Sequence, residues 1–74
     1  MKITEMMTKT DSSMVASVGW ASNKLYVEFK SGKVYSYEGV AFDVYARMLA
    51  AESKGRFFNS EIRDRYACSE VAAQ

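Results

Sequence analysis

Apolar and polar residues alternate most regularly between residues 24 and 37, KLYVEFKSGKVYSY. Leu25, Val27 and Phe29 are separated by polar or amphipathic side chains, which is the period-two pattern of a strand with one face buried. A second alternating run, residues 34–37, follows Gly32. The pattern predicts a β-hairpin.

The loop length decides which face of this hairpin each side chain occupies. A two-residue loop of Ser31 and Gly32 is strained, because a type I′ turn needs a positive φ at Ser31 and a type II′ turn needs glycine first. A three-residue loop over residues 30–32 needs a positive φ at Gly32 alone. We therefore predict that Val27 pairs with Tyr35 and Leu25 with Tyr37, and that Tyr26 and Val34 lie on the other face.

An earlier strand is predicted over residues 13–20, where Met14, Ala16, Val18 and Trp20 alternate with smaller or polar residues. Residues 21–23, Ala-Ser-Asn, have the composition of a turn. Such short connections make the three strands an antiparallel meander. Its apolar face would carry Met14, Val18, Trp20, Leu25, Val27, Phe29, Tyr35 and Tyr37.

Helical spacing replaces alternation after Gly39, with apolar residues at positions 42, 44, 45, 48, 49 and 51. We predict a main helix over residues 41–54, ended by Gly55 in the left-handed region, with Lys54 near its last carbonyls. Asn59 is expected to cap a second, shorter helix that Ile62 and Tyr66 anchor. The residues after Tyr66 are expected to fray.

The predicted fold class is α+β, with element order β-β-β-α-α: a three-stranded antiparallel meander, one main helix across its apolar face and a short C-terminal helix. Residues 1–12 are predicted to be a flexible N-terminal arm, residues 13–66 the folded domain and residues 67–74 a C-terminal tail.

Composition narrows the possible functions. The 74 residues suffice for one domain, and ten basic and nine acidic residues leave a net charge of +1, too little to argue for nucleic-acid binding through global charge. With no histidine and one cysteine, Cys68, we expect no metal site and no cofactor. The sequence has no apolar run of about 20 residues and no apolar signal block, so we expect a cytoplasmic protein without membrane contact. The sequence leaves a homo-oligomer possible, because so small a core often gains stability from association with a second copy.

Many residues in order resemble the KTSC domain, a small module found at the C-terminus of some lysyl-tRNA synthetases and alone in bacterial and phage proteins. The resemblance covers residues 12–66 and is carried by Ser12-Ser13, Val18-Gly19-Trp20, Leu25-x-Val27-x-Phe29, Gly32, Tyr35-x-Tyr37, Val40, Val44-Tyr45, Ala51-x-Ser53-x-Gly55, Phe58-Asn59, Ile62-Arg63 and Tyr66. Two positions depart from it: Ala41 stands where the family usually has proline, and Ala21 where it often has aspartate. The family has no established activity, and RNA binding is suggested by its attachment to a tRNA-charging enzyme.

Two groups of residues are candidates for nucleic-acid binding. Lys54, Arg56, Asn59 and Arg63 lie around a glycine turn and a helix start, where cations and backbone N–H groups can hold a phosphate. The same residues can serve structure alone, as a helix end, a cap and soluble surface. The rings of Tyr35 and Tyr37 could stack on bases, but the predicted register places both against the helix, in the core.

The alternative function is a protein-interaction adaptor, for example a phage-derived regulator of a host protein. Tyr26 and Val34 are its candidate surface, because the register leaves both on the uncovered face. No activated nucleophile, histidine base or glycine-rich phosphate loop is present. The sequence therefore favours a non-catalytic binding module, with RNA or another nucleic acid as first partner.

Overall fold

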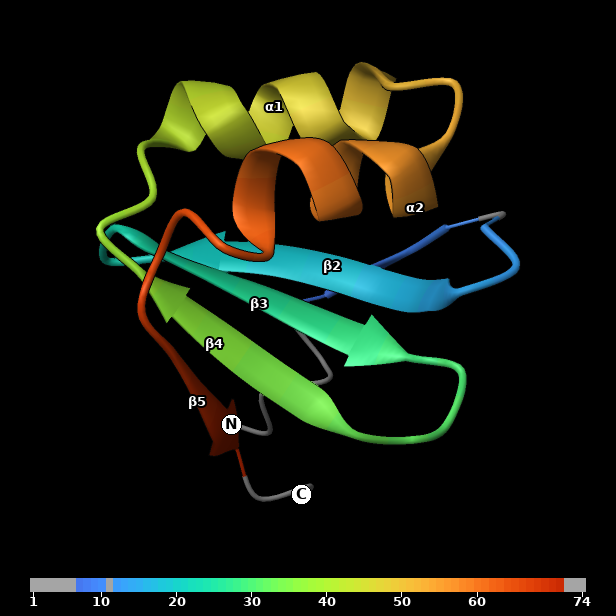
Figure 1. Ribbon diagram of the computed structural model, residues 1–74, viewed down its shortest axis with the longest axis horizontal. Helices are drawn as coiled ribbons and strands as arrows, with labels where there is room; N and C mark the ends of the chain where they lie inside the picture. The colour runs from blue at the N-terminus through green and yellow to red at the C-terminus, as the bar shows by residue number, and fades with distance from the viewer. Residues whose placement is uncertain (1–6, 11, 72–74) are drawn as a thin grey trace.

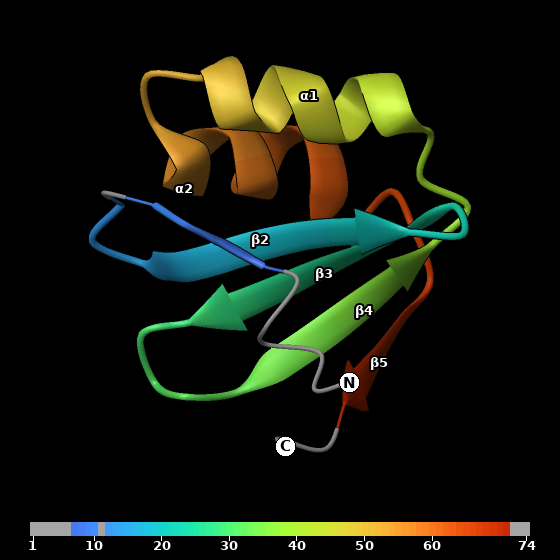
Figure 2. The ribbon, with the colours of Figure 1, turned by 180° about the vertical axis from the view of Figure 1, so that it is seen from behind.

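A computed structural model describes residues 7–10 and 12–71 and shows a curved antiparallel sheet with helices on one face (Figure 1). Five strands lie side by side in sequence order: β1 Thr8–Lys9, β2 Val15–Ala21, β3 Lys24–Phe29, β4 Val34–Glu38 and β5 Cys68–Val71. Helix α1 spans Phe42–Ala50, helix α2 spans Lys54–Phe57, and a π-helical segment, η2, continues α2 over Phe58–Ile62. In Figure 2, which shows the molecule from behind, the helices again lie on one side of the sheet.

The central hairpin, β3 and β4, has the predicted register, with Leu25 opposite Tyr37 and Val27 opposite Tyr35. Gly32 adopts a φ of 97°, a region that side chains with a Cβ rarely enter. Its N–H donates to the carbonyl of Phe29 at 2.9 Å, and the N–H of Phe29 donates to the carbonyl of Lys33 at 2.9 Å. The three-residue loop is thereby confirmed.

The turn between β2 and β3 is also confirmed, since Ser22 and Asn23 have φ values of 52° and 61° and Ala21 pairs with Lys24. The alternation predicted for the first strand fails at its start. A register shift between Val15 and Ser17 places Val15 opposite Phe29, and Val15 is fully buried. The bulge therefore turns Val15 to the helix face, where strict alternation had placed it outward.

The predicted three-stranded meander is wrong, because two short edge strands enlarge the sheet to five. Thr8 and Lys9, inside the predicted arm, pair with Val18 and Ser17 of β2. Cys68–Val71, inside the predicted tail, pair with β4 from Val34 to Tyr37. The remaining arm residues 1–6 and 11 and tail residues 72–74 lie outside the described residues. Both additions pair backbone groups at an edge of the predicted sheet, which would otherwise be open.

The predicted helix boundaries need a second correction. Helix α1 ends at Ala50, because Ala51 is extended, with φ −68° and ψ 139°. Ser53 then caps α2, its hydroxyl accepting a hydrogen bond from the N–H of Arg56 at 3.2 Å. Gly55 has no positive φ and lies within α2. Asn59 lies within η2 and does not cap a helix.

The core lies between the sheet and the helices. Its buried apolar side chains come from β2, β3, β4, the loop before α1, α1 and η2: Val15, Val18, Leu25, Val27, Tyr37, Val40, Met48, Phe58 and Ile62. Trp20 packs at its edge, and its Nε1–H donates to the carbonyl of Val40 at 2.8 Å, which fixes the chain just before α1. Within the described residues, no helix is both long and apolar enough to span a membrane.

Candidate functional site

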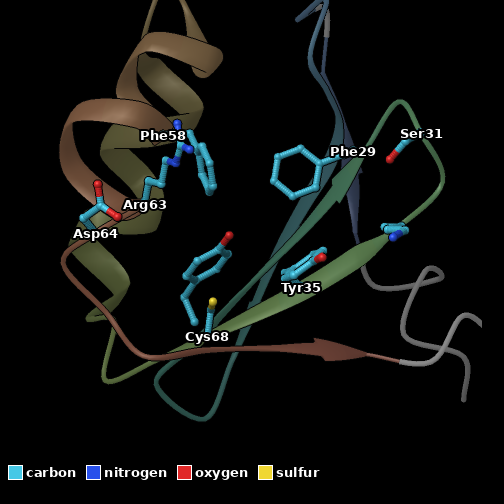
Figure 3. A pocket seen from close by; sticks show the side chains of 9 residues that line it. Phe29, Ser31, Tyr35, Phe58, Arg63, Asp64 and Cys68 are labelled. Carbon is cyan, nitrogen blue, oxygen red and sulfur yellow. The ribbon is translucent and has the colours of Figure 1, made fainter.

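A hollow lies where the β3–β4 hairpin, the end of η2 and β5 meet (Figure 3). It has a volume of about 540 Å³, within the usual range for ligand pockets. Nine residues line it: Phe29, Ser31, Lys33, Tyr35, Tyr37, Phe58, Arg63, Asp64 and Cys68. We call this feature the aromatic pocket.

Four rings form a continuous series in the aromatic pocket. Tyr35 meets Phe29 edge to face with centroids 5.9 Å apart, Phe29 meets Phe58 at 5.2 Å, and Phe58 meets Tyr37 at 5.5 Å. Interplanar angles of 76° to 77° are those that aromatic quadrupoles prefer. Each ring is therefore held in place before any ligand arrives, and Tyr35, which is only half-buried, remains accessible.

The two tyrosines of the hairpin have different surroundings. Both lie on the helix side, as predicted, but Tyr37 is only 4% exposed while Tyr35 lies at the edge of the core. Burial raises the pKa of Tyr37 to about 12, and the nearby Cys68 thiol and Tyr35 add to the rise, while Arg63 opposes it. The hydroxyl of Tyr37 is therefore neutral at physiological pH.

A π turn delivers Arg63 to the pocket. The N–H of Arg63 donates to the carbonyl of Phe58, five residues earlier, at 2.9 Å. Phe58 and Ile62 face the core, whereas the Arg63 side chain is exposed and reaches toward Phe58 (Figure 3). Asp64 lies beside it at the same end of the pocket. Insertions of this kind in a helix are frequent at functional sites.

The four residues predicted to bind nucleic acid do not lie together in one site. Arg63 lines the aromatic pocket, but Lys54, Arg56 and Asn59 do not. The ammonium of Lys54 donates to the carbonyl of Ala51 at 2.9 Å, so it satisfies the end of α1, as predicted for a cation at this position. Arg56 and Asn59 are exposed on α2 and η2.

The two residues predicted for protein interaction also differ from each other. Tyr26 is half-buried on the face away from the helices. Val34 is 2% exposed, so it offers no apolar surface there. The largest exposed apolar side chain among the described residues is instead Phe42, at 57%, which meets Trp20 edge to face at 5.3 Å.

Sequence reasoning missed most of the pocket. The sequence predicts Phe29, Tyr35 and Tyr37 as core residues, and it indicates no binding role for Ser31, Lys33, Phe58, Asp64 or Cys68. One signal was available for Lys33, since Gly32 and the three-residue loop fix it opposite Phe29. Cys68 could not be placed without β5.

The chain is similar to a known protein family, to two bacterial proteins and to a solved structure. A family model described as the KTSC domain matches residues 11–66. A protein of Tsukamurella paurometabola is 36% identical over 62 residues, covering 81% of this chain and 92% of the relative. An uncharacterized protein of Stutzerimonas stutzeri is 39% identical over 57 residues, covering 74% and 80%. The crystal structure of a KTSC domain protein from Yersinia pestis superposes with a TM-score of 0.83 at 30% identity, covering 89% of this chain and 96% of that one.

Proposed function

This chain belongs to the KTSC domain family, and from that premise we propose that it is a non-catalytic module that binds single-stranded RNA, or another single-stranded nucleic acid, in the aromatic pocket. The observation that carries the proposal is the series of four ordered rings in an open hollow that also holds Lys33 and Arg63.

The rings supply sequence-tolerant affinity. An unpaired base can stack on the accessible ring of Tyr35, and such stacking contributes about 1–3 kcal/mol per base. Because Tyr35 is braced edge to face by Phe29, little side-chain entropy is lost when a base arrives. A base within a duplex cannot reach the ring, which favours single strands.

The cations supply attraction to the backbone. A net charge of +1 gives the molecule little overall field, so the local placement of Lys33 and Arg63 matters more than the total. Each phosphate that one of these cations neutralises adds about −0.7 to the slope of log K against log salt for a single strand. Binding should therefore be modest and salt-dependent.

The proposal is tested by fluorescence anisotropy with a labelled mixed-sequence RNA octamer at low salt. We expect Tyr35→Ala to weaken binding about tenfold or more, because the stacking ring is removed. Tyr26→Ala is the matched control, since Tyr26 lies on the opposite face. No binding by the unmodified protein at low salt, or equal losses in the two variants, would contradict the proposal.

A second comparison locates the phosphate contacts. We expect Lys33→Ala to flatten the salt slope by about 0.7 and Arg56→Ala to leave it unchanged, since Arg56 does not line the pocket. The reverse result would move the phosphate site to the Lys54, Arg56 and Asn59 surface on α2 and η2.

Capture of a protein partner is the second candidate function, and the exposed ring of Phe42 favours it. Phe42 meets Trp20 at 5.3 Å and Tyr45 at 5.8 Å, so three aromatic side chains gather at the start of α1. Aromatic clusters of this kind are enriched at protein interfaces. Phe42→Ser should abolish co-purification of such a partner, whereas Tyr26→Lys tests the surface predicted from the sequence.

A further inference from the structure

The polar groups of the aromatic pocket differ in what they offer a ligand. Arg63 and Lys33 can only donate hydrogen bonds, Asp64 can only accept them when ionised, and Tyr37 and Ser31 carry hydroxyls that do both. A ligand that pairs with these groups needs hydrogen-bond acceptors on the edge that faces Arg63 and Lys33. It needs hydrogen-bond donors on the edge that faces Asp64.

The hydroxyl of Tyr37 is the most informative of these groups. Tyr37 is only 4% exposed, and none of the side-chain hydrogen bonds found among residues 7–10 and 12–71 involves its hydroxyl. Across the same residues, every fully enclosed polar side-chain atom has a partner. The hydroxyl oxygen is therefore not enclosed, and the open space it reaches is the pocket that Tyr37 lines. Arg63 lines the same pocket, and its side chain reaches toward Phe58, whose ring packs on that of Tyr37 at 5.5 Å, so the two donors border one space (Figure 3).

Nucleobases differ in whether they can accept from two neighbouring donors. Guanine presents N7 and O6 side by side, and cytosine presents N3 and O2, whereas adenine and uracil alternate donors with acceptors. A guanidinium fork matches two adjacent acceptors in one plane. Because Arg63 and Tyr37 both border this pocket, a base that meets the two donors together would be guanine or cytosine.

Asp64 separates these two bases. Beyond O6, guanine carries the N1–H and N2–H donors in parallel, which match the two oxygens of one carboxylate. Cytosine offers a carboxylate only its N4 amino group. Asp64 follows Arg63 in the chain and lies at the same end of the pocket, so one base can meet both side chains (Figure 3).

We propose that the aromatic pocket holds one unpaired guanine, with Arg63 and Tyr37 donating toward its O6 and N7 and Asp64 accepting from its N1–H and N2–H. This inference rests on the proposed RNA-binding function. It also divides the cations: Arg63 reads the base, and Lys33 contacts the strand's phosphate.

The test uses labelled RNA octamers that are uridine throughout except for one central position, which is guanosine, cytidine, adenosine or uridine. We expect the guanosine octamer to bind about tenfold or more tightly than the other three, as one well-placed bidentate contact provides. A single guanosine in each strand avoids association through guanine quartets. Equal affinity for all four octamers, or a preference for cytidine, overturns the guanine assignment and leaves RNA binding intact. Absence of binding to every octamer overturns both.

Two variants separate base reading from charge. Arg63→Lys keeps the positive charge but loses the planar fork, so the preference for guanosine should disappear while the salt slope stays the same. Lys33→Ala should do the opposite, flattening the salt slope and keeping the preference. If Arg63→Lys retains the full preference, the assignment of Arg63 to the base is wrong.

Asp64→Asn is expected to reduce the preference for guanosine over cytidine, because an amide cannot accept two parallel hydrogen bonds. Asp43→Asn removes an exposed carboxylate in the first turn of α1, outside the pocket, and serves as its matched control. Circular dichroism confirms that each variant is folded. An unchanged preference in Asp64→Asn refutes guanine recognition by this carboxylate.

Discussion

The raised pKa of Tyr37 predicts how the stability of the domain changes at high pH. Its pKa is about 12 in the folded protein and 10.0 when the chain is unfolded. Below pH 10 the group is protonated in both states, so it causes no pH dependence. Between pH 10 and 12 the unfolded state loses the proton while the folded state keeps it, so the free energy of unfolding falls as pH rises.

The size of this effect follows from the difference between the two pKa values. Two pKa units correspond to at most about 3 kcal/mol. Solvent in the open pocket that Tyr37 lines screens part of this, so we expect a loss of about 1–2 kcal/mol, most of it by about pH 12. A domain of this size has a total stability of about 5–10 kcal/mol, so the loss is a large fraction of it.

The assay is urea unfolding, followed by circular dichroism, at half-unit steps from pH 8 to pH 11.5. Tyr37→Phe removes the titrating group and keeps the ring that packs on Phe58 at 5.5 Å. We expect the unmodified protein to lose about 1 kcal/mol more than this variant over that range, after allowance for solvent screening. Tyr26→Phe, which changes a half-buried tyrosine on the other face, should follow the unmodified protein. Parallel curves for the unmodified protein and Tyr37→Phe would refute the argument.

Two further predictions concern the local structure that shapes the pocket. Gly32→Ala should lower the free energy of unfolding by about 1–2 kcal/mol in a urea titration. The space beside Gly32 is free, but a φ of 97° strains any residue that has a Cβ. Unchanged stability would contradict this prediction. Ser53→Ala should cost about 1 kcal/mol through loss of the α2 cap, whereas the exposed Ser13→Ala should cost almost nothing, and equal costs would refute the capping role.

Local signals explain what could be predicted from the sequence. Gly32 needs a positive φ and the strands on either side alternate, so a few neighbouring residues determine the hairpin register. The same register places Tyr35 and Tyr37 on the helix side. These features need no information from distant parts of the chain.

The features that sequence reasoning missed depend on contacts between distant segments. Strands β1 and β5 have two and four residues, too few for a periodic pattern, and form because the edges of β2 and β4 offer unpaired backbone groups. The break after Ala50 also went unpredicted, because Ser53 competes with the continuing helix by capping a new one.

The candidate site was predicted only in part for the same reason. Arg63 was chosen for its neighbours in sequence, but it lies with Lys33 and Cys68, which are 30 residues before it and five after it. The sequence predicts the rings of Phe29, Tyr35 and Tyr37 as core residues, and the hollow beside them forms only when β5 and the end of η2 are in place.

The π turn at Phe58–Ile62 also bears on how this pocket can be gained or lost in evolution. A π turn contains one residue more than the α-helical turn it replaces, so removing a single codon between Asn59 and Glu61 would restore regular winding. Everything downstream would then rotate by about 100°, carrying Arg63 away from the rings and changing where β5 begins. Relatives that keep the sheet but have a helix shorter by one residue would thus share the architecture without sharing the ligand.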